Sequence, residues 1–403
     1  MSFETMKRFL NDLKIFLFFF LGTALPCMSQ SGYTLKGVVN DSRTKEPVPF
    51  ASVFLSSTMI GSQTTETGSY LLQNIPPAKY DLTISSVGYK IAKYPVLINE
   101  KLTVLNISLE PDVKMLKEIT IVAKRSDYRK QVAWFKRYFL GETINASKCR
   151  IVNLDHVEFK FDEEDSIFTA SCDEPIEVEN NALGYRVLYY LEEFKLDFHA
   201  RRLVFGGFPY FKPLKPGQNE RDFKLVKARD RAYYGSMNHF MRSLRSLKLH
   251  SNNFSVYPAN AESVPPQPPH PDRVMSRAVI PVRNNEINAS FILNSPYEKL
   301  LALKIIYRGE SPEYNYNQKQ FRFELPQVSY LKFLKHNLVI HENGYYEDPL
   351  QYYLEGYWGW SDKIVAELLP LEYQPVLTPR EKSRMEKIDK ADSLMAVKES
   401  WQD

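Results

Sequence analysis

The sequence predicts a mainly β protein, in which an N-terminal β-sandwich is followed by a β-rich α+β region. The composition supports this class, because 25 Tyr, 25 Phe and 25 Pro stand beside only 16 Gly, and flat aromatic side chains are favoured on sheet faces. The pattern supports it too. Between residues 33 and 110, alternating apolar and polar runs recur at roughly ten-residue spacing with Pro and Gly between them, which is typical of a small sandwich.

The first residues of the chain have the pattern of an export signal. A basic start precedes an apolar run, 15–25, that is shorter than the roughly 20 residues a bilayer requires. The small residues Cys27 and Ser29 predict cleavage before Gln30, with 1–29 as the signal peptide. A lipoprotein signal acylated at Cys27 stays open as the alternative. We therefore expect an exported protein, periplasmic or outer-membrane-associated, without a transmembrane helix in the mature chain.

Charge and cysteine content restrict the partners and the chemistry. A formal net charge of +4 is too small to indicate a nucleic-acid partner. Cys149 and Cys172 are able to pair in an oxidising compartment. The segment between them has the pattern of a hairpin turning at 162–165, which places Cys172 opposite about Asp155. A disulfide and two buried thiols both remain open.

The strands of the first unit follow from its alternations. We expect strands at 33–40, 50–55, 70–72, 80–85 and 102–109, separated by turn-rich or polar segments at 41–49, 61–68 and 76–77.

Three stretches of this unit, LKGVVNDSRTKEPVPFASVFL, TTETGSYLLQNIPPAKYDLTISSVGYK and VLNISLEP, resemble the carboxypeptidase regulatory-like domain. The resemblance implies that 30–112 form a transthyretin-like, Greek-key sandwich with a carbohydrate-binding-like fold. That domain is non-catalytic in the carboxypeptidases, and in Bacteroidetes envelope proteins it often precedes outer-membrane receptors. LKEITIVAK, 116–124, resembles the segment that joins it to the receptor plug, and we expect a linker at 113–130. The resemblance thus implies a Bacteroidetes protein of the cell envelope.

The remaining chain is too short for the barrel of such receptors. Its later segments NALGYRVLYYLEEF, AYYGSMNHFMRSL and GYWGWSDKIVAELLPLEYQP resemble exported proteins known only by their regulatory-like domain, a resemblance that implies no reaction. We expect helices at 130–140, from Ser236 onward with Ser236 as N-cap, and at 362–369. The expected strands are 157–161, 167–171, 185–190, 194–198, 278–282, 291–293, 301–307 and 339–340.

The organisation of this second part follows from composition. We expect an α+β region at 131–262, a Pro-rich loop at 263–273 and a β-rich continuation at 274–378. The charged tail, 379–403, is expected to be a frayed helix or disordered.

No catalytic motif stands out. No His has Glu three residues later, and His341-Glu342 lacks the second His of a zinc site. Ser236 and His239 are spaced for a Ser–His pair, but helix capping explains Ser236 without any chemistry, and we expect a cap. The acidic turn 162–165 is a Ca²⁺ candidate without the spacing of a loop site. We expect a non-enzymatic protein without cofactor or metal. A pocket that gathers His239, Arg231 and carboxylates would instead favour an unrecognised hydrolase.

Two surfaces are candidates for ligand or partner contact. YYLEGYWGW concentrates five aromatic residues, which are either core or rings exposed to a sugar or protein. A basic segment interleaved with aromatics suits an anionic envelope surface or an acidic glycan. The candidate contact residues are Tyr352, Tyr353, Tyr357, Trp358, Trp360, Arg201 and Arg202. The expected function is a protein-binding or structural module, with glycan binding as the alternative.

Overall fold

The computed structural model describes residues 32–112, 125–215, 222–258, 280–282, 286–288, 302–317, 326–333, 339–341, 343–346, 352–362 and 364–399. The expected signal peptide, the receptor-like joint, the Pro-rich loop and the strand at 291–293 lie outside them. Among the described helices, none is long and apolar enough to cross a membrane.

The first unit is a sandwich of two four-stranded sheets. One sheet holds β4 (Ser69–Ile75), β1 (Tyr33–Asp41), β7 (Leu102–Val104) and β8 (Ile107–Leu109). The other holds β3 (Gly61–Gln63), β2 (Ser52–Leu55), β5 (Ala78–Ser85) and β6 (Ala92–Ile98). Alternation along β1 puts Leu35 and Val39 in the core while Lys36 is exposed, because successive side chains point to opposite faces. The predicted sandwich is confirmed. The segment 61–68, expected to be polar and without a strand, begins with β3, and the strand expected at 102–109 is divided into β7 and β8, each paired with β1. No strand was expected at β6.

The second region begins with a six-stranded sheet. Its strands are β9 (Cys149–Ile151), β10 (Glu158–Asp162), β11 (Ile167–Ser171), β12 (Ile176–Asn180), β13 (Tyr185–Asp197) and β14 (Arg202–Pro213). Helix α2 (Arg125–Phe139) stacks Phe135 and Phe139 against this sheet, and both rings are fully buried. The core is therefore aromatic, as the composition suggested.

One expectation for this sheet was wrong. The strands expected at 185–190 and 194–198 are one strand, β13, bent by a bulge between Leu191 and Glu193. A bulge inserts an extra residue without ending the strand, so the apolar alternation breaks although the pairing continues. The basic segment from Arg202 begins with β14, which pairs with β13 over its length.

A third sheet consists of β15 (Phe254–Pro258), β18 (Ala302–Tyr307), β19 (Gln327–Phe333) and β21 (Tyr352–Gly356). A small fourth sheet consists of β16 (Ile280–Val282), β17 (Glu286–Asn288) and β20 (Val339–Ile340).

Helix α4 (Met237–Arg245) packs Phe240, Met241 and Leu244 into the core of the third sheet. Its predicted N-cap is confirmed, since the Ser236 hydroxyl accepts a hydrogen bond from the His239 backbone N–H. Helix α3 (Phe223–Tyr233), capped by Asp222, was not expected.

The C-terminal helices also differ from expectation. The helix expected at 362–369 is replaced by α7 (Tyr357–Ser361) and a 3-10 turn, Val365–Glu367, joined by extended backbone at Ile364. Tertiary bonds favour this division, because the Trp358 indole donates to the Gly235 carbonyl at 2.6 Å. The charged tail forms α8 (Pro379–Glu399), which begins with a reciprocal capping box between Thr378 and Glu381.

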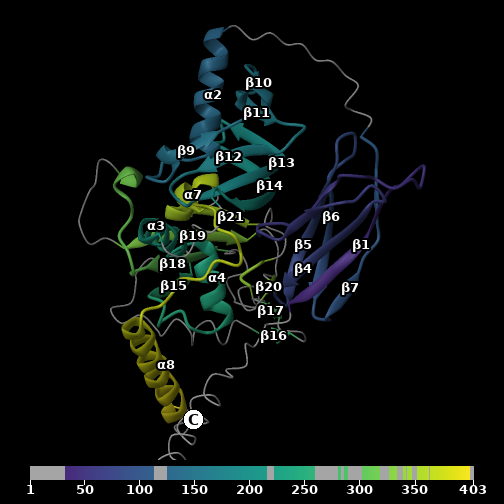
Figure 1. Ribbon diagram of the computed structural model, residues 1–403. Helices are drawn as coiled ribbons and strands as arrows, with labels where there is room; N and C mark the ends of the chain where they lie inside the picture. The colour runs from purple at the N-terminus through teal and green to yellow at the C-terminus, as the bar shows by residue number, and fades with distance from the viewer. Residues whose placement is uncertain are drawn as a thin grey trace, which may run out of the picture.

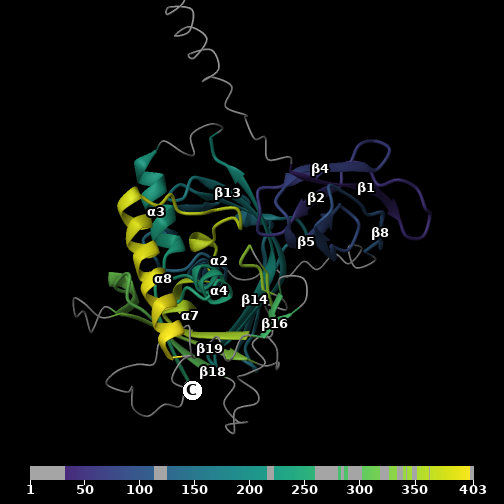
Figure 2. The ribbon, with the colours of Figure 1, turned by 90° about the horizontal axis from the view of Figure 1, so that it is seen from below.

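The sandwich is docked on the second region (Figure 1; Figure 2, from below). Phe54 of β2 stacks between Tyr190 and Tyr210, with ring centroids 4.8 and 5.1 Å away. The turn after β2 extends the edge of β14, since the Ser57 N–H donates to Pro209 at 2.7 Å and Thr58 accepts from Phe211 at 3.0 Å. Aromatic stacking and backbone hydrogen bonds thus join the two units.

Candidate functional site

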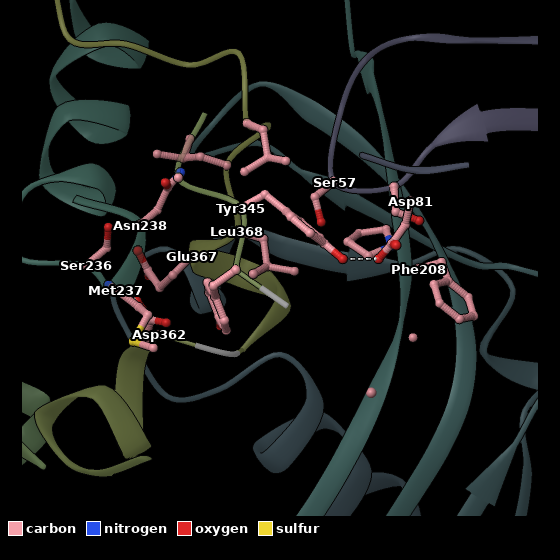
Figure 3. Close-up of a pocket in the computed structure, with 18 of the residues that line it drawn as sticks. Ser57, Asp81, Phe208, Ser236, Met237, Asn238, Tyr345, Asp362, Glu367 and Leu368 are labelled. Carbon is pink, nitrogen blue, oxygen red and sulfur yellow. Dashed lines mark hydrogen bonds between the residues drawn. The ribbon is translucent and has the colours of Figure 1, made fainter. Parts of the chain in front are cut away.

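A cavity of about 420 Å³ lies between the sandwich and the second region (Figure 3). The sandwich contributes Ser57, Asp81 and Lys93, and Phe208 of β14 and Tyr345 lie beside them. The N-terminal turn of α4 and the segment near Leu368 lie on the other side of the cavity. Ligand sites are often found at such boundaries between domains, because two rigid units enclose a space that neither could form alone.

The sandwich side of the cavity is held by a network around Asp81. This carboxylate, buried in the middle of β5, accepts a hydrogen bond from the Tyr345 hydroxyl at 2.9 Å and pairs with the Lys93 ammonium at 3.1 Å. Lys93 also lies over the Phe208 ring, 5.6 Å from its centroid. Asn343 bonds the Lys79 carbonyl at 3.2 Å. The network therefore ties the segment 343–346 to the sandwich and leaves Asp81 with its charge neutralised.

The opposite end gathers acceptor groups from α4 and the C-terminal segment. Asp362 accepts from the Met237 backbone N–H at 2.6 Å, which places a carboxylate at the N-terminus of α4, where the helix dipole favours it. The side-chain carbonyl oxygen of Asn238 is buried and has no hydrogen-bond partner within the described part of the chain. Figure 3 shows Ser236, Asn238, Asp362 and Glu367 on this side, facing the Asp81–Tyr345 side.

Glu367 is a buried carboxyl group of the cavity wall with a raised pKa. Its two oxygens accept hydrogen bonds from the Thr143 hydroxyl at 2.5 Å and the Asn145 amide at 2.9 Å. Burial raises the pKa of Glu367 to about 7, although these two bonds act in the opposite direction. The 3-10 turn positions this side chain, and Asn180 holds the turn by donating to the Ala366 carbonyl at 2.9 Å.

A small chamber of about 30 Å³ adjoins this end of the cavity and shares Ala232, Ser236, Asp362 and Glu367 with it. Gln327, only 3% exposed, also lines the chamber, and its side-chain carbonyl oxygen has no partner among the described residues. Glu313 contributes a third carboxylate, whose pKa burial raises, and Arg231 contributes the one cation of the described lining. The chamber is thus small, polar and rich in acceptors.

The larger cavity combines these polar groups with rings. The aromatic residues that line it are Tyr189, Phe205, Phe208, Tyr233, Tyr345 and Tyr346. Rings supply flat apolar faces, and the carboxylates supply acceptors at defined positions. The arrangement is suited to a ligand that has both an apolar face and several hydrogen-bond donors.

The residues predicted for contact lie elsewhere. Tyr352, Tyr357 and Trp358 are 5%, 8% and 2% exposed and belong to the core of the third sheet, so packing explains these rings. Tyr353 and Trp360 are partly exposed, and the Arg202 guanidinium stacks on Tyr353 and donates to its hydroxyl. Arg201 is exposed in the turn before β14, with φ 51°. Of the seven, all within the described ranges, only Tyr357 borders the chamber.

The Ser236–His239 pair does not form a catalytic dyad. His239 is 3% exposed, and its ring lies between Phe254 and Tyr233 with centroids 4.9 and 5.0 Å away. Its Nδ1 accepts the Gly235 N–H at 3.1 Å, and burial lowers the pKa of His239 to about 4. The imidazole is therefore a buried, neutral packing group, and Ser236 acts as the helix cap.

Packing and hydrogen bonding within the fold account for the two cysteines and for the acidic turn 162–165. Cys149 and Cys172 are free and half-buried, so the alternative of unpaired thiols is the observed one. Asp162 accepts backbone bonds from Glu164 and Asp165, which makes the acidic segment a hydrogen-bonded turn. In the described ranges, no group of three or more His, Cys, Asp or Glu side chains is arranged to hold a metal ion.

The cavity residues escaped sequence analysis because they come from distant segments. Asp81 was the detectable one, since a carboxylate at a buried position of an alternating strand requires a partner. Asn238, Gln327, Asp362 and Glu367 have no local signal, and only the tertiary fold brings them to one place.

Comparison with known proteins identifies the first unit. The family model of the CarboxypepD_reg-like domain matches residues 35–121. No curated protein matches the chain.

Solved structures give weak likenesses. A type II cohesin–X-dockerin complex from Acetivibrio cellulolyticus is 17% identical over 19% of this chain and 53% of that chain, with a TM-score of 0.17. A candidate carbohydrate-binding protein from Bacteroides uniformis is 11% identical over 46% of this chain and 80% of that chain, with a TM-score of 0.18. A DUF3823 family protein from Bacteroides ovatus is 13% identical over 46% of this chain and 83% of that chain, with a TM-score of 0.17. The chain spans about half the length of the first of these. Such low TM-scores carry no conclusion about function.

Proposed function

We propose that the protein is an exported, non-enzymatic binding protein of a Bacteroidetes cell envelope, in which the regulatory-like sandwich and the second region together bind a saccharide. The observation that carries this proposal is the cavity of about 420 Å³ between the two units, with aromatic rings and fixed carboxylates in its wall. The family match at residues 35–121 supports a binding or scaffolding role for the sandwich.

The chemistry of the wall suits a sugar. Sugar rings present C–H faces that pack on aromatic side chains, and their hydroxyl groups donate to carboxylates and amide oxygens. Phe208 and Tyr345 provide such faces, while Asp362 and Asn238 provide acceptors. A buried acceptor without a partner has a free-energy cost of about 1–3 kcal/mol, which a donating ligand would remove.

The non-enzymatic part of the proposal rests on the reactive groups. His239 is sealed in the core and Ser236 caps a helix, so the nucleophile–base pair suggested by spacing is not available. Both oxygens of Glu367 are engaged by Thr143 and Asn145, which suits a fixed wall of the site better than a group that shuttles protons.

A role as protein–protein adaptor receives less support. The turn after β2, an obvious contact loop of the sandwich, is already used against Pro209 and Phe211. The sheet edge at β6 carries Lys93 and Pro95, and both residue types discourage pairing with a further strand.

The test is ligand binding by the purified mature chain, measured by calorimetry against envelope oligosaccharides, together with cell fractionation. We expect saccharide binding that Phe208→Ala weakens by about tenfold, the loss of a stacking contact of about 1.4 kcal/mol. Phe50→Ala, which removes an exposed ring from a loop outside the cavity lining, is the matched control. Saccharide binding that survives Phe208→Ala unchanged, or recovery of the protein only in the cytosol, would contradict the proposal.

A further inference from the structure

The chamber beside the cavity is lined by several hydrogen-bond acceptors. Carboxyl groups of Glu313, Asp362 and Glu367 line it, and Arg231 is the one cation of the described lining. The Gln327 side chain gives a second, independent indication of a ligand. The residue is only 3% exposed, and its carbonyl oxygen is a buried acceptor without a partner among the described residues. This oxygen lies against Gly235 of the chamber wall, since a Cβ added to Gly235 would be only 2.5 Å from it.

The size of the chamber selects the group that would meet these acceptors. A space of about 30 Å³ holds one water molecule or one ammonium group and no sugar ring. An ammonium has three N–H donors and no acceptor, so it satisfies several oxygens at once. A hydroxyl offers one donor and two acceptor lone pairs, so it satisfies fewer of these oxygens than an ammonium does.

The cavity and the chamber form one site in two parts. They share Ser236, Asp362 and Glu367, so a ligand whose rings lie in the cavity is able to direct a substituent into the chamber. At the far side Asp81 is already paired with Lys93 and Tyr345. At the chamber end, no ion pair within the described residues joins Glu313 or Glu367.

We infer that the chamber takes the ammonium group of a saccharide that carries a free amine, while the cavity holds its rings. This inference rests on the proposed saccharide binding and names the substituent that the site selects. Because a nearby cation stabilises a carboxylate, bound ammonium would lower the raised pKa values of Glu313 and Glu367 and release protons.

The experiment compares three probes on the mature chain by calorimetry, at a pH below the pKa of the ligand amines. The probes are a glucosamine trimer, which has free amines, the N-acetylglucosamine trimer, which has none, and putrescine, which has amines but no sugar. We expect the glucosamine trimer to bind about tenfold tighter than its acetylated counterpart. Binding of putrescine, weaker than that of the trimer, is also expected.

Variants locate the selectivity. Glu367→Gln keeps the shape of the side chain. We expect it to abolish the tenfold preference for the glucosamine trimer, so that both trimers bind with about equal affinity and binding of the acetylated trimer is retained. Gln327→Met, which removes the orphan acceptor, should reduce the preference in the same direction and serves if Glu367→Gln fails to fold. Glu164→Gln, an equal charge removal on the exposed turn of the β10–β11 hairpin, is the control and should leave the preference intact.

The outcomes separate the two proposals. Equal affinity for both trimers, or a preference that both variants leave unchanged, overturns the ammonium subsite and leaves saccharide binding standing. Binding of putrescine with neither trimer bound overturns the saccharide proposal while the chamber is kept as an amine site. Absence of binding by all three probes overturns both.

Discussion

The two regions of this molecule bury different kinds of groups. The sandwich core consists of aliphatic and tyrosine side chains from alternating strands. Of its buried carboxylates, Asp41 accepts backbone hydrogen bonds in a turn of the sandwich, and Asp81 lies on the side that faces the second region. The second region buries charged and titratable groups within its own fold, among them Arg229, His239 and Glu367. Apolar burial stabilises any fold, whereas buried polar groups need partners at defined positions. The stability of the second region therefore depends more on the placement of partners for its buried ionisable groups.

The contact between the regions is where this comparison is most sharply tested. Phe54→Ala removes a ring that is 1% exposed and stacks on Tyr190 and Tyr210, so we expect a loss of about 3–5 kcal/mol. If the stack couples the two regions, calorimetric unfolding should also separate into two transitions in the variant. The exposed Phe50 provides the control, since Phe50→Ala should leave the melting curve within about 0.5 kcal/mol of the wild type. A Phe54→Ala variant with one unshifted transition would contradict the coupling.

The buried carboxyl group of Glu367 predicts a pH dependence opposite in sign to that of Asp41 in the sandwich, whose pKa is lowered by backbone hydrogen bonds from Thr44 and Arg43. The pKa of Glu367 is raised to about 7 in the folded state from 4.5, so the native protein binds this proton more tightly than the unfolded chain. The associated stability is complete below about pH 4.5 and is lost as the pH rises through about 7. The full loss is about 3 kcal/mol, from 1.36 kcal/mol per pKa unit.

Glu367→Gln removes this titration. We expect the variant to lose less stability than the wild type between about pH 5 and 8, as measured by urea unfolding at each pH. Glu310, whose pKa burial also raises to about 7, contributes in the same direction in both proteins, so the difference between them isolates Glu367. Parallel stability curves for wild type and variant would show that the carboxyl group is not held in its neutral form.

Helix capping gives the smallest expected effect. Ser236→Ala deletes the acceptor for the His239 N–H at the start of α4, at a cost of about 1 kcal/mol. Thr378→Ala deletes a similar cap on α8, which is largely exposed and outside the core clusters, so global unfolding should shift by less than about 0.5 kcal/mol. Guanidinium melts of the two variants make the comparison. Equal shifts would mean that α8 is as tightly coupled to the fold as α4.

The local sequence pattern was sufficient to predict elements whose side chains repeat with a short period. Alternation predicted β1 and β11, and the residue type at position 236 predicted the start of α4. It failed where a distant partner changed the outcome. The β13 bulge breaks the alternation that marks a strand, and bonds from Trp358 and Ala366 to residues far along the chain divide the helix expected at 362–369.

By itself, then, the sequence determined the sandwich, the aromatic cores and the absence of a familiar catalytic motif, because these depend on residue type and on spacings of a few residues. Only the tertiary structure decided the cavity and its chamber. Asp81, Gln327 and the pair Asp362 and Glu367 lie on three separate segments, and each is an ordinary polar residue within its own neighbourhood. Docking of the sandwich on β14 and packing of the C-terminal segment against α4 bring them together, and burial then raises the pKa of Glu367.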